Sequence, residues 1–154
     1  MHKAQQGFTM IELVMVIVIL GILAAVAMPR FYDLQTDARK AKADGIFGTV
    51  RSASAIAHSA YLVSGSASTG SVTIEAQTIT LINGYPTANA AGIIAAANLD
   101  ATKDNVAIGT GGAVAGSAIT IQIGGAKTAA NCQITYTAPA AGAAPTIVVD
   151  KSDC

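Results

Sequence analysis

Residues 7–29 read GFTMIELVMVIVILGILAAVAMP, and this stretch decides how the chain is organised. Leu13 to Pro29 are 17 residues without a charge, and a helix from Phe8 to Met28 would measure about 31 Å, the thickness of a bilayer's hydrocarbon core. Glu12 stands at the edge of this run, although a carboxylate at the bilayer centre costs about 2.5–3.5 kcal/mol. The stretch therefore predicts a membrane helix in which Glu12 needs a partner.

Two ordinary interpretations account for part of this stretch. In a secretory signal peptide, Lys3 would be the positive start and Ala25-Val26-Ala27 the cleavage site. However, Glu12 interrupts the apolar region, and a cut after Ala27 would discard the start of a helix that continues. A plain single-pass anchor explains the length of the run, but neither Gly7 nor Glu12.

A third interpretation starts from the pattern K-x-x-x-G-F-T-x-x-E, formed by Lys3, Gly7, Phe8, Thr9 and Glu12 directly before the apolar run. This pattern resembles the leader and N-terminus of the type IVa pilins and their type II secretion relatives. The resemblance implies that residues 1–7 are a leader, removed between Gly7 and Phe8 by a prepilin peptidase. It also implies N-methylation of the new Phe8 amine. Lys3 would keep the leader in the cytoplasm.

Cleavage would also supply the partner that Glu12 needs. The released Phe8 amine is cationic and lies one helical turn from Glu12, and a carboxylate in the first turn suits the helix dipole. In a filament, the amine of a docking subunit can neutralise Glu12 of its neighbour, and a buried pair costs far less than a buried lone charge. Glu12 is thus predicted to form an assembly salt bridge that selects the register. The alternative is that Glu12 simply reaches the membrane interface.

The helical pattern continues beyond Pro29. Residues 30–64 are predicted to form an amphipathic half that follows the filament-core half at residues 8–29, with an end near Ser64-Gly65-Ser66. Pro29 removes a backbone donor, so a kink is expected near it. The resemblance further implies that the helix between Gly21 and Pro29 melts in the assembled filament. The predicted apolar stripe is Phe31, Leu34, Ala38, Ala41, Gly45, Ile46, Val50, Ala53, Ala57 and Tyr61.

Residues 65–154 are predicted to form a β-rich head. Asn83-Gly84 indicates a turn, and Thr87–Leu99 a short helix capped by Thr87 or Asn89. The fold class is α+β, a type IV pilin fold in which an antiparallel sheet packs on the C-terminal half of the long helix. The expected strands are Ser71–Glu75, Thr78–Ile82, Val106–Ile108, Ala118–Ile123, Gln133–Thr137 and Thr146–Val149.

Cys132 and Cys154 are the two cysteines of the chain. In a chain with an N-terminal apolar segment they indicate one disulfide in an oxidising compartment, and a buried free pair is the alternative. The bridge would close a loop of about 23 residues and contribute about 3 kcal/mol. It would bracket residues 138–145, which are low in complexity and are expected to form an exposed hairpin tip.

This layout resembles the disulfide-bounded C-terminal region of type IV pilins. Within that family, Leu81–Pro86, Gly92-Ile93 and Cys132–Tyr136 resemble the mannose-sensitive haemagglutinin pilins.

Catalytic and metal-binding patterns are missing from the sequence. The histidines are His2 and His58, and no His/Cys cluster has zinc spacing. His58 and Ser59 would point about 100° apart on a helix, so they form no dyad. The segment Asp100–Asp104 suits a solvated loop better than a calcium site. We expect no enzyme activity, cofactor or metal, and the balance of nine basic and nine acidic residues argues against nucleic acid.

The function predicted is therefore structural: a pilin subunit that polymerises into a type IV pilus for adhesion, motility or DNA uptake. The expected partners are copies of the chain, a prepilin peptidase, an inner-membrane assembly platform and ATPases. The prepilin would sit in the inner membrane and the assembled pilus outside the cell. The alternatives are a type II secretion pseudopilin and a monomeric membrane-anchored binding domain. A conductive fibre built on Phe8, Phe31 and Tyr32 is less favoured than ordinary aromatic packing. No surface ligand is indicated.

Overall fold

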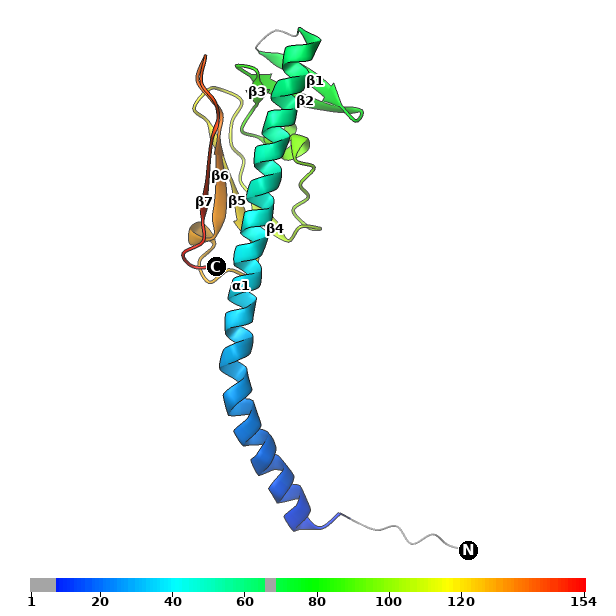
Figure 1. Cartoon of the computed structure of the whole chain (residues 1–154), viewed down its shortest axis with the longest axis vertical. Coiled ribbons are helices and arrows are strands. Elements are labelled where there is room, and N and C mark those ends of the chain that lie inside the picture. Colours follow the sequence, from blue (N-terminus) through cyan, green and yellow to red (C-terminus); the bar gives the residue numbers. More distant parts are fainter. Residues whose placement is uncertain (1–7, 66–68) are drawn as a thin grey trace, which may run out of the picture. The chain divides into compact units, whose positions relative to one another are not determined.

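The computed structural model describes residues 8–65 and 69–154, apart from the side chains of residues 28–33. The chain divides into two compact units, Met1–Thr36 and Asp37–Cys154. Helix α1 (Met10–Ser64) begins in the first unit and ends in the second, close to the predicted limits (Figure 1). The helix assignment runs through Pro29 without a break. Because Pro29, Phe31 and Tyr32 lie outside the described side chains, the kink and the packing of the two rings stay predictions.

One face of α1 within the second unit is buried against the head. Its residues are spaced three and four apart, so they form a single stripe along the helix. Four residues of the predicted stripe lie elsewhere: Leu34 is 65% exposed, and Ala38, Ala41 and Gly45 are also exposed. The small residues Ala38, Ala41 and Gly45 gave no signal for the true face, and Leu34 lies before the second unit begins. The buried stripe is Ala43, Ile46, Val50, Ala53 and Ala57.

The first sheet follows α1 and has the strand order β1-β2-β3. Strands β1 (Gly70–Ile74) and β2 (Gln77–Ile82) form a hairpin, and β2 pairs in turn with β3 (Tyr85–Pro86). Asn83 and Gly84 have φ of 52° and 80°, as a two-residue type I′ turn requires, which confirms the predicted turn. A Cβ at Gly84 would also lie 2.6 Å from the Tyr61 ring.

The second sheet has the strand order β4-β5-β6-β7, and every pair is antiparallel. Its strands match the predicted limits to within one residue. The described residues thus contain two sheets where a single one was expected. The strands of this sheet are β4 (Val106–Ile108), β5 (Ala118–Ile123), β6 (Gln133–Thr137) and β7 (Thr146–Asp150).

The helix expected at Thr87–Leu99 is confined to a short π-helical turn, η1 (Ala90–Ile94). Asn89 caps it, because its Oδ1 accepts from the Gly92 backbone N–H at 2.9 Å. Gly92 interrupts the helical backbone with φ −99° and ψ −106°. A Cβ there would lie 2.1 Å from the Thr87 carbonyl oxygen, so this close approach requires glycine. A 3₁₀ turn, η2 (Ala129–Asn131), precedes β6.

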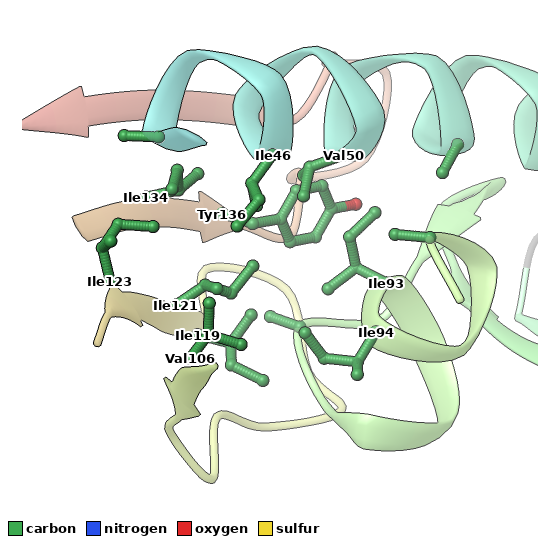
Figure 2. Close-up of a cluster of buried hydrophobic side chains, with 14 of the residues drawn as sticks. Ile46, Val50, Ile93, Ile94, Val106, Ile119, Ile121, Ile123, Ile134 and Tyr136 are labelled. Carbon is green, nitrogen blue, oxygen red and sulfur yellow. The ribbon is translucent and has the colours of Figure 1, made fainter. Parts of the chain in front are cut away.

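The core lies between the buried face of α1 and the second sheet. Figure 2 shows Ile46 and Val50 of α1 above the side chains of β5 and β6, with Ile93 of η1 at one end. Tyr136 of β6 is fully buried, and its hydroxyl donates to the Pro86 carbonyl oxygen at 2.7 Å. Burial raises the pKa of this hydroxyl to about 12, partly offset by the nearby Ser54 hydroxyl. Tyr136 therefore joins the two sheets as a neutral donor.

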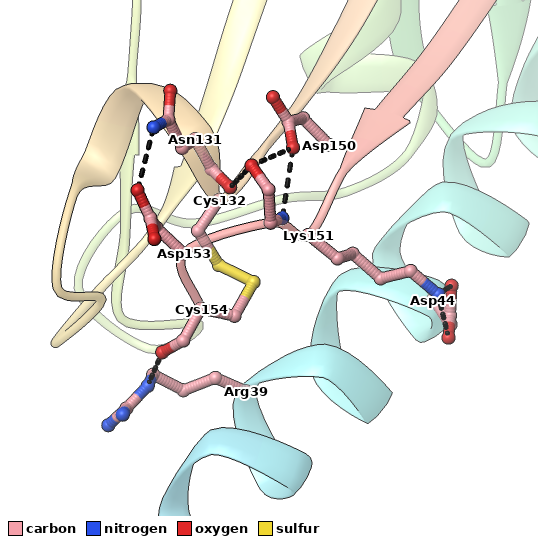
Figure 3. Close-up of a disulfide and its surroundings, with 9 residues drawn as sticks. Arg39, Asp44, Asn131, Cys132, Asp150, Lys151, Asp153 and Cys154 are labelled. Atoms are coloured by element: carbon pink, nitrogen blue, oxygen red, sulfur yellow. Dashed lines mark hydrogen bonds and ion pairs between the residues drawn. A yellow bond between two sulfur atoms is a disulfide. The ribbon is translucent and has the colours of Figure 1, made fainter.

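The C-terminus is fixed to the head and to α1 (Figure 3). Cys132 and Cys154 form the predicted disulfide, and both are buried. Arg39 of α1 donates from Nε to the Cys154 carbonyl oxygen. Lys151 pairs with Asp44 at 2.8 Å, although this exposed pair contributes little. The disulfide brackets the β6–β7 hairpin, as expected. Residues 140–144 at its tip are exposed, whereas Ala138 is buried.

The turn between β1 and β2 allows a test of the fold. Glu75 and Ala76 have φ of 49° and 64°, a conformation that costs non-glycine residues about 1–2 kcal/mol each. Ala76→Gly should therefore raise the free energy of unfolding by about 0.5–1 kcal/mol, after the greater entropy of unfolded glycine is subtracted. Urea unfolding of the full chain in detergent, followed by near-ultraviolet circular dichroism, measures this change.

The matched control is Ala107→Gly. Ala107 is exposed in β4 and does not have positive φ, so glycine there should lower the free energy of unfolding. If both substitutions destabilise the chain equally, the turn conformation assigned to Ala76 is wrong.

Candidate maturation and assembly site

The predicted cleavage site lies directly before α1. Gly7 is outside the described residues, whereas Phe8 is described and its side chain is 79% exposed. Phe8 and Thr9 precede the first helical residue, Met10. The peptide bond predicted to be cut, between Gly7 and Phe8, therefore ends at a residue that is exposed and lies before the helix.

Thr9 and Glu12 form a reciprocal cap at the start of α1. Glu12 Oε2 accepts from the Thr9 backbone N–H at 2.9 Å and from the Thr9 hydroxyl at 2.6 Å. The Glu12 backbone N–H in turn donates to Thr9 Oγ1 at 3.3 Å. This arrangement is a capping box, and it satisfies two backbone donors that the helix itself cannot.

The capping role of Thr9 and Glu12 was not among the predictions made from the sequence. The signal was present, because Thr-x-x-Glu before an apolar run is the usual capping-box pattern. Glu12 is thus held at the helix end by its own chain. Its second oxygen, Oε1, makes no hydrogen bond with any described residue, so it can still accept from a cation.

The helix that follows Glu12 is uncovered. The window Met10–Ala27 has a mean hydropathy of 2.9, and none of it is buried inside the described part of the protein. By length and composition it is able to cross a membrane. Its large side chains are 45–86% exposed. Gly21 lies within this window, and a Cβ added there would have no described atom within 4 Å outside its own stretch of helix.

The residues that the sequence offered as candidates for metal binding or catalysis make ordinary structural contacts instead. Asp100 Oδ1 accepts from the backbone N–H groups of Lys103 and Thr102, both at 2.9 Å, which lowers the pKa of this carboxyl. Ser59 donates to the Ala55 carbonyl oxygen rather than to His58. Among the described residues, no group of three or more His, Cys, Asp or Glu side chains is placed to hold a metal ion.

Comparison with known protein families gives a match that includes this site. Residues 2–28 match the family described as the prokaryotic N-terminal methylation motif. The chain is 58% identical over 52 residues to the major component of the narrow type IV pilus of Thermus thermophilus, which covers 34% of this chain and 45% of that protein. It is 51% identical over 43 residues to a type IV major pilin of Neisseria gonorrhoeae, covering 28% and 26%. A fimbrial protein of Pseudomonas aeruginosa is 61% identical over 31 residues, or 20% of each chain.

These matches confirm the resemblance to type IV pilins. The chain spans less than half the length of these relatives, and no solved structure matches it. The long helix followed by antiparallel sheets is nevertheless a type IV pilin-like α+β fold. The narrower resemblance to the mannose-sensitive haemagglutinin pilins stays a prediction.

The capping box gives a direct prediction. Thr9→Val keeps the shape of the side chain but removes its hydroxyl, so the cap should be weakened by about 1 kcal/mol. The amides of residues 10–12 should then exchange hydrogen several-fold faster, as measured by NMR of the full chain in detergent. Thr9→Ser keeps the hydroxyl and is the matched control. Equal exchange rates in Thr9→Val and the unaltered chain would contradict the cap.

Proposed function

We propose that this chain is a prepilin whose mature form, residues 8–154, polymerises into a type IV pilus. One observation carries the proposal: the N-terminal methylation motif leads directly into an apolar helix that no described part of the protein covers. An uncovered apolar surface of this size needs lipid or another protein around it. The similarity to proteins named as type IV pilins supports other protein, rather than lipid alone, as the final surroundings of this helix.

The apolar helix would occupy two environments in turn. The prepilin is held in the inner membrane, and the mature subunit then enters the filament core, where residues 8–29 pack against copies of themselves. The free energy of the apolar side chains changes little in this transfer, because neighbouring helices are as apolar as lipid. The charged groups at the helix start therefore decide whether the transfer is favourable.

Maturation would create the charge that Glu12 requires. A prepilin peptidase cuts between Gly7 and Phe8 and removes the leader, residues 1–7, and the Phe8 amine is then methylated. This amine can bind the uncapped Oε1 of Glu12 on a neighbouring subunit, while Thr9 continues to hold Oε2. The subunit docks where this pair forms, since a carboxylate left unpaired in the filament core would be costly.

The head would face outward on the filament, outside the cell, with the disulfide suited to that oxidising environment. An inner-membrane platform and cytoplasmic ATPases would drive assembly. We also propose that the helix between Gly21 and Pro29 loses regular hydrogen bonding in the filament. A filament reconstruction with unbroken helical bonding through this segment would contradict that part.

A type II secretion pseudopilin is the second candidate, because such proteins share the N-terminal motif. The relatives named as pilins and fimbrial proteins favour the pilus. Imaging cells with an antibody against residues 69–154 separates the two: a pilin gives long surface fibres, and a pseudopilin does not. A membrane-anchored binding domain would instead stay monomeric and keep Met1.

The cleavage claim is tested with Gly7→Leu. A bulky residue beside the scissile bond should block the peptidase, so precursor that retains residues 1–7 should accumulate in the membrane. Mass spectrometry of the membrane fraction measures this precursor. Ala4→Leu, which lies in the leader but away from the bond, is the control and should be processed. Normal maturation of Gly7→Leu would defeat the claim.

The assembly claim is tested with Glu12→Gln. Glutamine also completes a capping box, so the helix start is kept while the charge is lost. The variant should be cleaved normally but form at least tenfold fewer surface fibres, counted by electron microscopy. Thr9→Val makes the opposite change, since it loses the hydroxyl and keeps the charge. Abundant fibres from Glu12→Gln, or a greater loss from Thr9→Val, would exclude pairing as the decisive interaction.

A further inference from the structure

A cleft on the head lies between α1 and the tip of the β6–β7 hairpin, and the proposed filament does not explain it. Its volume is about 520 Å³, within the range of small-molecule sites. One wall is a face of α1 with residues at three- and four-residue steps, including Arg51, Ser54 and His58. The opposite side has apolar residues of the hairpin, such as Ile147, and Tyr85 of β3.

Ser54 is buried in the wall of the cleft and is only 2% exposed. Its hydroxyl oxygen is closed to solvent, so a ligand in the cleft does not reach it. It lies beside the Tyr136 hydroxyl, which donates to Pro86 and whose oxygen can still accept from Ser54. Ser54 therefore belongs to the fold of this wall, and the polar groups that the cleft presents to a ligand lie elsewhere.

Arg51 supplies an unpaired cation at the edge of the same cleft. It is exposed and forms neither an ion pair nor a hydrogen bond within the part of the chain that the structure describes. No acidic side chain is among the described residues that line the cleft. Arginine binds carboxylates with two parallel N–H donors, which gives both strength and orientation. The cleft therefore favours an anion over a neutral or cationic ligand.

His58 and Tyr85 form a fixed platform beside these groups. Their rings stack with centroids 4.0 Å apart and planes 4° apart. His58 Nδ1 lies 2.8 Å from the Gly84 carbonyl oxygen, so Nδ1 must carry the proton that is donated. Nε2 is then the acceptor in the neutral ring. Both rings are held before any ligand arrives, which lowers the entropic cost of binding.

We propose that this cleft binds a small organic carboxylate with a ring-sized body. Its carboxylate pairs with Arg51, and its body packs against Tyr85 and Ile147. Two sources provide this chemistry, an aromatic acid and an acidic sugar. The site is independent of the Gly7–Glu12 region, so it stands or falls separately from the proposed assembly.

The test is an NMR titration of the full mature chain in detergent, with the resonances of His58 and Tyr85 as the local readout. The probes are phenylacetate and galacturonate, with phenylacetamide and galactose as their neutral counterparts. At least one acid should give saturable shifts at these residues, with an affinity at least tenfold above that of its neutral counterpart. The acid that binds more tightly identifies the source.

Variants of the chain complete the test. Arg51→Gln should weaken binding of the acid at least tenfold, because the charge-assisted pair is lost. Lys127→Gln removes the same charge from an exposed position outside the cleft and should leave binding unchanged. The proposal is overturned if neither acid gives saturable shifts, if the neutral probes bind as well, or if Arg51→Gln binds like the unaltered chain.

Discussion

The uncovered apolar surface of α1 between Met10 and Ala27 is the constraint on which the other features depend. Each buried aliphatic side chain contributes about 1.5–3 kcal/mol relative to exposure, so a run of this length cannot be left in water. No described part of the protein covers it. The run therefore needs lipid or other protein around it. In the proposed assembly it exchanges the first for the second, and every charged group at the helix start is subject to that exchange. The charged group at the helix start is the Glu12 carboxylate. Thr9 donates hydrogen bonds to only one of its two oxygens, Oε2.

The head is organised around the other half of the same helix. Ile46 and Val50 close the core over β5 and β6, and Tyr136 connects that core to the first sheet through Pro86. The disulfide and Arg39 fix the last residue of the chain. All of these contacts lie within the second unit, Asp37–Cys154. Such a division suits a protein in which one part must change environment while the other presents a constant surface.

Features that depend on local sequence could be predicted, and features that depend on distant contacts could not. Strands β4 to β7 and the Asn83-Gly84 turn followed from alternation and turn chemistry. The Glu75-Ala76 turn did not, because its residues are not turn formers and pairing of the flanking strands imposes the conformation. The short helix expected at Thr87–Leu99 is present with its predicted Asn89 cap, but it is confined to Ala90–Ile94. The sequence pattern did not show that the backbone leaves helical geometry at Gly92, where it packs closely on Thr87. At the candidate site, the spacing of Gly7, Phe8 and Glu12 was evident, yet the capping role of Thr9 was missed although its motif was present.

The central claim is that the apolar helix leaves the membrane for a filament only after cleavage has created a positive N-terminus. Mass spectrometry of filaments sheared from the cell surface tests it most directly. The account predicts that the dominant filament protein begins at N-methylated Phe8 and carries an intact Cys132–Cys154 disulfide. Filaments whose subunits begin at Met1, or after Ala27, would contradict it.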